Sequence, residues 1–91
     1  KLDVDGSELM VLKSGENFLK NKKPPIFMEL APYLYREHGY ELNDLLEFII
    51  KIGYHFYEID SIKKIIDIKK FSSLIKDGSS INILLKANWI N

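Results

Sequence analysis

The alternation of apolar and polar positions predicts four short strands in this chain. Apolar and acidic side chains alternate in residues 1–5, so that each kind points to one side of an extended segment. The run IFMELA, residues 26–31, is apolar except for Glu29, which is typical of a strand buried on both faces. The segments YHFYEID (54–60) and INILLKA (81–87) predict two further strands.

Helical periodicity fills the segments between these strands. Ser7 is a predicted N-cap, and Gly15 either lets the helix that follows approach a sheet closely or interrupts it. Residues 42–50 carry an apolar stripe that Gly53 closes, and residues 68–75 predict a short helix. The first helix has one predicted apolar face, which contains Val11, Leu12, Gly15, Phe18 and Leu19.

The order of these elements is strand, helix, strand, helix, strand, short helix, strand. This order predicts an α/β fold in which helices connect the strands of one sheet. The chain has 91 residues and no internal repeat, which suits a single domain.

Composition removes several classes of function. Thirteen basic residues balance thirteen acidic ones, so we expect neither a nucleic acid nor an anionic membrane as a partner. There is no cysteine, which excludes disulfides, thiolate metal sites and cysteine nucleophiles. No apolar run approaches the roughly 18 residues of a membrane span, and we expect a cytoplasmic protein.

The segment KLDVDGSELMVLKSGENFLKNKKPPIFMEL, residues 1–30, resembles the C-terminal half of FkbM-type methyltransferases, which use S-adenosylmethionine. Its most specific part is the stretch from Asp3 to Glu8, DVDGSE, followed by VL and Gly15. The later stretch ELNDLLEFIIKIGYHFYEID is similar to the helix and Gly-Tyr strand of that family. The family usually has Glu where this chain has Asp5, and position 31, often polar there, is alanine here.

The resemblance implies a seven-stranded sheet in the order 3-2-1-4-5-7-6. Residues 1–91 would be the C-terminal part of a single methyltransferase-like domain. They would supply the last four strands of a partial Rossmann-like sheet with flanking helices, the final strand being antiparallel. No two of the five glycines are spaced like a nucleotide-binding loop, so the main S-adenosylmethionine site would lie outside this chain. We therefore expect a fragment of a larger enzyme domain, which self-associates through the exposed edge at residues 1–5.

The resemblance also indicates where acidic side chains gather. Ligands of open α/β sheets bind beyond the carboxyl ends of the strands, and Asp3, Asp5 and Glu29 would lie there. We expect Asp5 or Glu29 to position or deprotonate an acceptor hydroxyl, and Asp3 to face the cofactor and orient the loop. Alternatively, Asp5 and Glu8 only cap the helix that follows. The three carboxylates could hold a hard cation, but no spacing requires one, and we predict no metal site.

Aromatic side chains crowd the segment PYLYREHGY, residues 32–40, a predicted loop or irregular helix. By resemblance it shapes the pocket for a small-molecule acceptor, with Tyr33, Tyr35 and His38 as the substrate-binding residues. Alternatively, these rings cover the sheet edge. The predicted activity is O-methylation of a sugar or another small-molecule hydroxyl. The alternative is a small non-catalytic α/β binding module that is complete at this length and melts cooperatively as a monomer.

Overall fold

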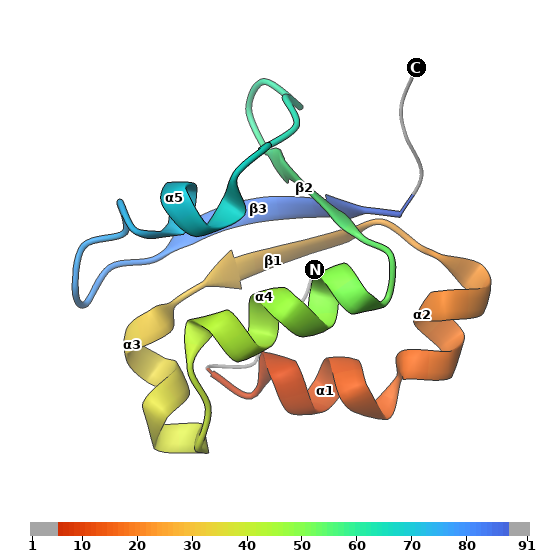
Figure 1. The fold of residues 1–91 in the computed structure, drawn as a ribbon, viewed down its shortest axis with the longest axis horizontal. Coiled ribbons are helices and arrows are strands. Elements are labelled where there is room, and N and C mark those ends of the chain that lie inside the picture. Colours follow the sequence, from red (N-terminus) through yellow and green to blue (C-terminus); the bar gives the residue numbers. More distant parts are fainter. Residues whose placement is uncertain (1–5, 88–91) are drawn as a thin grey trace.

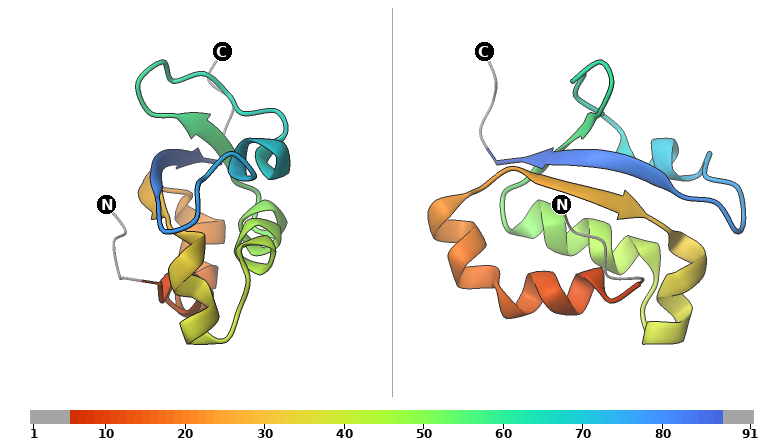
Figure 2. Two further views of the ribbon diagram at one scale, coloured as in Figure 1. Left: turned by 90° about the vertical axis from the view of Figure 1, so that its left-hand side faces the viewer. Right: turned by 180° about the vertical axis from the view of Figure 1, so that it is seen from behind.

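The computed structural model describes residues 6–87, in which helices α1, α2 and α4 lie along one side of a small sheet (Figure 1, Figure 2). The elements, in chain order, are α1 (Glu8–Ser14), α2 (Glu16–Lys22), β1 (Ile26–Leu30), α3 (Pro32–Tyr35), the 3-10 helix η1 (Arg36–His38), α4 (Leu42–Lys51), β2 (His55–Glu58), α5 (Ile68–Ser72) and β3 (Ile81–Lys86). The mixed α/β class predicted from the sequence is confirmed.

The described sheet has the order β1-β3-β2, with β3 antiparallel to both neighbours. Because both outer strands run against β3, β1 and β2 run parallel to each other. The connection between them passes through α3, η1 and α4 (Figure 1). The three later strands predicted from the sequence are therefore present. The first predicted strand, residues 1–5, lies outside the described residues.

The helix-facing side of the sheet forms the core. Met28 and Leu30 of β1 are 0% exposed, as are Ile83, which lies opposite Met28, and Leu85 on β3. The prediction that residues 26–31 are buried on both faces is wrong, because Phe27 is 45% exposed. Successive side chains of a strand point to opposite faces, and the helices that the structure describes cover mainly one of them.

The first predicted helix is two helices, separated at Gly15. This residue has φ −101° and ψ 16°, which ends α1, and α2 starts at the next position. Gly15 therefore interrupts the helix, the second of the two alternatives. The predicted apolar face is only partly correct. Leu12 and Leu19 are buried, whereas Val11 and Phe18 are largely exposed, because each short helix turns its own leucine to the core.

Helix α4 follows its predicted apolar stripe in part, because Ile50, which belongs to that stripe, is 50% exposed. A capping box closes the N-terminus of this helix. The Glu41 side chain accepts a hydrogen bond from the Asp44 backbone N–H, and the Asp44 side chain accepts one from the Glu41 backbone N–H. Leu45, Leu46 and Ile49 are buried against the sheet side of the core. Beyond the helix, Gly53 adopts φ +92°, a conformation that glycine accepts at little cost.

The central position of β3 gives the first testable prediction. Replacing Ile83, which is fully buried, with alanine leaves a cavity and should lower the free energy of unfolding by about 2–5 kcal/mol. Leu74→Ala is the control, because Leu74 is 77% exposed and should cost less than about 0.5 kcal/mol. Urea denaturation followed by circular dichroism measures both values. Similar losses for the two variants would contradict a buried central β3.

Candidate functional site

The turn at Gly6 is held by Tyr40, which follows Gly6 by 34 positions and Leu9 by 31 positions in the sequence. The Tyr40 hydroxyl donates a hydrogen bond to the Gly6 carbonyl oxygen and accepts one from the Leu9 backbone N–H at 3.4 Å. Both bonds are buried, and buried backbone groups need such partners. Tyr40 therefore holds the turn that leads into α1.

Tyr35 stacks on Tyr40 and connects this turn to the carboxyl end of β1. The two ring centroids are 4.9 Å apart with an interplanar angle of 18°. The Tyr35 hydroxyl accepts a hydrogen bond from the Ala31 N–H at 3.1 Å and donates one to the Glu29 carbonyl oxygen at 3.4 Å. We call Tyr35 and Tyr40 the tyrosine pair. It joins the Gly6 turn to the end of β1.

Burial keeps the tyrosine pair protonated. Loss of solvent raises the pKa of Tyr35, and to a lesser degree the carboxylate of Glu8 raises it too. Burial, followed by the same carboxylate, also raises the pKa of Tyr40. Both hydroxyls therefore remain hydrogen-bond donors at physiological pH.

Glu8 is a buried acidic residue close to the tyrosine pair. It is the first residue of α1, where the helix dipole favours a negative charge, as the capping alternative expects. It is also only 2% exposed, which the sequence analysis missed. The sequence feature that could have indicated a special role for Glu8 is its position as the last residue of the DVDGSE stretch. Its burial beside the tyrosine pair shows that Glu8 is more than a solvated cap.

The three predicted substrate-binding residues have different surroundings. Tyr33, on α3, is 46% exposed, and His38, at the end of η1, is also exposed. Tyr35 is 0% exposed, so its ring supports the turn and has no surface for stacking on a ligand. Tyr33 and His38 thus lie on the surface beyond the carboxyl end of β1.

The Gly6 turn leaves no room for a side chain. Gly6 has φ +100°, and a Cβ atom built there would lie 2.7 Å from His38 Cδ2 and 3.0 Å from Leu34 Cβ. His38 therefore packs its imidazole edge against the glycine backbone. This contact brings a predicted substrate-binding residue, His38, next to Gly6 of the DVDGSE stretch.

Glu29 is the one predicted catalytic acid within the described residues. It is partly buried near the end of β1, and its Oε2 accepts a hydrogen bond from Ser80 Oγ at 2.7 Å. Asn82 is its partner in register on β3. Asp3 and Asp5 lie outside the described residues, so their placement relative to Glu29 stays a prediction.

A pocket of about 420 Å³ lies at the carboxyl end of β2, with Ser80 in its wall. Two acids that the sequence analysis did not single out, Glu58 and Asp60, also line it. The sequence feature that could have indicated Glu58 is its position as an acid at the end of the aromatic segment YHFYEID. The remaining lining residues are Ile59, Phe71, Ile81 and Asn82. Carboxylate, hydroxyl and amide groups at one strand end suit a ligand with several hydroxyls.

Within residues 6–87, no group of three or more His, Cys, Asp or Glu side chains is placed to hold a metal ion. The same part of the chain contains no helix with the length and apolar character needed to cross a membrane.

Comparison of the chain with protein-family models, curated proteins and solved structures found no match.

The hydrogen bonds of Tyr40 can be tested by removing one oxygen atom. Tyr40→Phe leaves the Gly6 carbonyl and the Leu9 N–H buried without this partner, and should destabilise the protein by about 1–3 kcal/mol. Tyr33→Phe makes the same change at an exposed ring and should cost less than about 0.5 kcal/mol. Chemical denaturation compares them. Equal stabilities would show that the tyrosine pair does not hold the turn.

The tight contact at Gly6 gives a separate prediction. Gly6→Ala meets both a positive φ and the nearby His38 and Leu34, whereas Gly39→Ala meets only a positive φ of +83° with open space around it. We expect Gly6→Ala to cost about 1–3 kcal/mol more than Gly39→Ala, because crowding adds to backbone strain. Thermal unfolding of both variants measures the difference, and equal costs would rule out the packed turn.

Proposed function

We propose that this chain is the C-terminal part of an S-adenosylmethionine-dependent methyltransferase domain. The parent enzyme would methylate a hydroxyl oxygen of a sugar or another small molecule. The observation that carries the proposal is the strand order β1-β3-β2 with β3 antiparallel to both neighbours. It equals the last three positions, 5-7-6, of the sheet order that the resemblance implies.

This order is informative because it is not the simplest one. Strands that follow each other in the sequence usually lie side by side, yet β1 and β2 are separated by the strand that comes last. The chain must leave a space between two parallel strands and fill it with β3. The methyltransferase sheet is one arrangement that does this.

The position of the Gly6 turn also supports the proposal. The tyrosine pair holds this turn beside the carboxyl end of β1, where ligands of open α/β sheets bind. Glu29, Tyr33 and His38 belong to the same strand end or to the segment that follows it. The Gly6 turn, which is the described part of the predicted motif, thus lies in the same region as the predicted acceptor residues.

The described residues fit the acceptor side of a methyl transfer. Glu29 has a carboxylate oriented by Ser80 and can take the proton of an acceptor hydroxyl. Tyr33 and His38 offer exposed rings to the body of the acceptor. S-adenosylmethionine, when bound, supplies a methyl group on a sulfonium sulfur. The described residues include no glycine-rich turn after an apolar strand, so they do not form the adenosyl site by themselves.

The remaining roles are carried by residues 1–5. In the proposal Asp5 is the alternative base and Asp3 faces the cofactor. Self-association through the edge at residues 1–5 would apply to the 91-residue chain alone.

The test uses the parent protein that the proposal implies, with this chain as its C-terminal part. We expect saturable binding of S-adenosylmethionine in calorimetry and transfer of its labelled methyl group to a panel of sugar and small-molecule hydroxyls. Glu29→Gln removes the base and should lower kcat by about 10²-fold or more with little change in cofactor affinity.

Glu37→Gln is the matched control, because it removes the same charge at an exposed position of η1. A kcat for Glu29→Gln within about twofold of the unchanged enzyme would refute the role of Glu29 as base. Absence of cofactor binding and of methyl transfer by the parent protein would refute the proposed function. Cooperative melting of the 91-residue chain as a monomer would then identify it as the alternative, a small binding module.

A further inference from the structure

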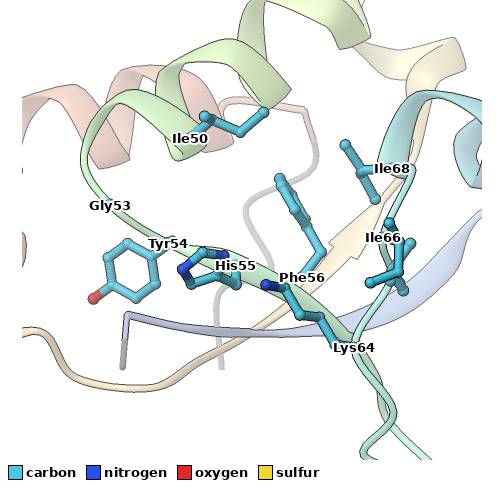
Figure 3. A pocket seen from close by; sticks show the side chains of 9 residues that line it. Ile50, Gly53, Tyr54, His55, Phe56, Lys64, Ile66 and Ile68 are labelled. Atoms are coloured by element: carbon cyan, nitrogen blue, oxygen red, sulfur yellow. The ribbon is translucent and has the colours of Figure 1, made fainter. Parts of the chain in front are cut away.

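A second pocket, of about 260 Å³, lies between the C-terminal end of α4, β2 and residues 64–68 (Figure 3). Ile50, Phe56 and Ile68 form apolar walls. His55 and Lys64 also line the pocket, and the Lys64 side chain extends toward the His55 ring (Figure 3). The pocket therefore combines an aliphatic interior with two basic side chains on one side.

This pocket is separate from the candidate methyl-transfer region. His55 pairs with Lys86 on β3, whereas Leu30, at the carboxyl end of β1, pairs with Ile81. Five residue steps along β3 separate these positions, which is about 17 Å in an extended strand. The pocket lies at the amino end of β2, away from the strand ends at which Glu29 and Ser80 meet.

Charge around the pocket favours an anion. Among the described residues that line it, Lys64 and His55 are the ones that carry or can gain a positive charge, and none is acidic. Lys86 lies opposite His55 on β3 and adds a third basic group nearby. The Tyr54 hydroxyl donates a hydrogen bond to the Pro24 carbonyl oxygen at 2.6 Å, and α4 contributes no titratable group to the lining.

The apolar walls favour an anion that carries an aliphatic group. Ile50 is 50% exposed and Ile66, at the rim, is 86% exposed, so a ligand can cover apolar surface that otherwise faces water. The volume is below the usual range of about 300–1,000 Å³ for drug-sized ligands, which restricts the occupant to a small molecule.

We propose that this pocket binds a small aliphatic carboxylate, with its carboxylate between Lys64 and His55 and its hydrocarbon chain against Ile50, Phe56 and Ile68. The site adds a ligand-binding function that does not depend on methyl transfer. A carboxylate there accepts a charge-assisted hydrogen bond from Lys64 and favours the protonated form of His55.

Binding should depend on pH through His55. Burial, followed by the charge of Lys64, lowers the pKa of His55 below its ordinary value, so the imidazole is neutral at neutral pH. A bound carboxylate favours the protonated form and raises this pKa again. Proton uptake then accompanies binding, and affinity increases as the pH falls from about 8 to about 6.

The experiment titrates the chain with hexanoate, hexan-1-ol and hexylammonium while NMR follows the His55 ring and the Ile68 methyl signals. We expect saturable shifts with hexanoate, and binding of the alcohol and the amine weaker by about tenfold or more. Lys64→Gln should weaken hexanoate binding by about fivefold to tenfold, whereas Lys76→Gln, an equal charge change at an exposed position outside the lining, should leave it unchanged.

His55→Gln should weaken hexanoate binding more at pH 6 than at pH 8, which removes the pH dependence of the affinity. Thermal unfolding shows first that each variant is folded. The proposal is overturned if hexanoate gives no saturable shift, if hexylammonium binds as tightly as hexanoate, or if Lys64→Gln and Lys76→Gln bind hexanoate equally. These readouts involve no methyl transfer, so they stand apart from the test of the proposed function.

Discussion

The stacking and hydrogen bonding of the tyrosine pair hold the N-terminal turn against the sheet. Tyr40 satisfies two backbone groups of that turn, and Tyr35 satisfies two backbone groups at the end of β1. Because the groups that Tyr40 binds and the Ala31 N–H are buried, losing either hydroxyl would leave a buried polar atom without this partner. The pair therefore fixes the distance between the Gly6 turn and the strand end at which the proposed chemistry takes place.

The second constraint is that the last strand completes the sheet. β1 and β2 contact β3 and not each other, so neither has a described strand partner until residues 81–86 are in place. Ile83 and Leu85 then fill the middle of the core between side chains from both outer strands. Contacts between residues this far apart in sequence carry a large loop-closure cost, which burial of the core must offset.

The candidate site was predictable only where a residue's role follows from its immediate neighbours. Glu29 stood out because it is the single charge in an apolar run, and the structure gives it a hydroxyl partner, Ser80. Tyr33 and Tyr35 looked equivalent in the sequence, yet one is exposed and the other fully buried. Their difference depends on Tyr40, which the linear pattern does not place against Tyr35.

The sequence by itself determined the features that depend on residues a few positions apart. These features are the alternation of side chains along the strands, the apolar stripe and the capping box of α4, and the turn at Gly53. Tertiary structure decided which strand lies in the middle, how far Glu8 is buried, and where the two pockets form. The bonds of Tyr40 show the reason: they join residues 31 and 34 positions apart, and no short-range pattern specifies such a pairing. Only the packed chain brings these groups within reach and excludes the water that would otherwise satisfy them.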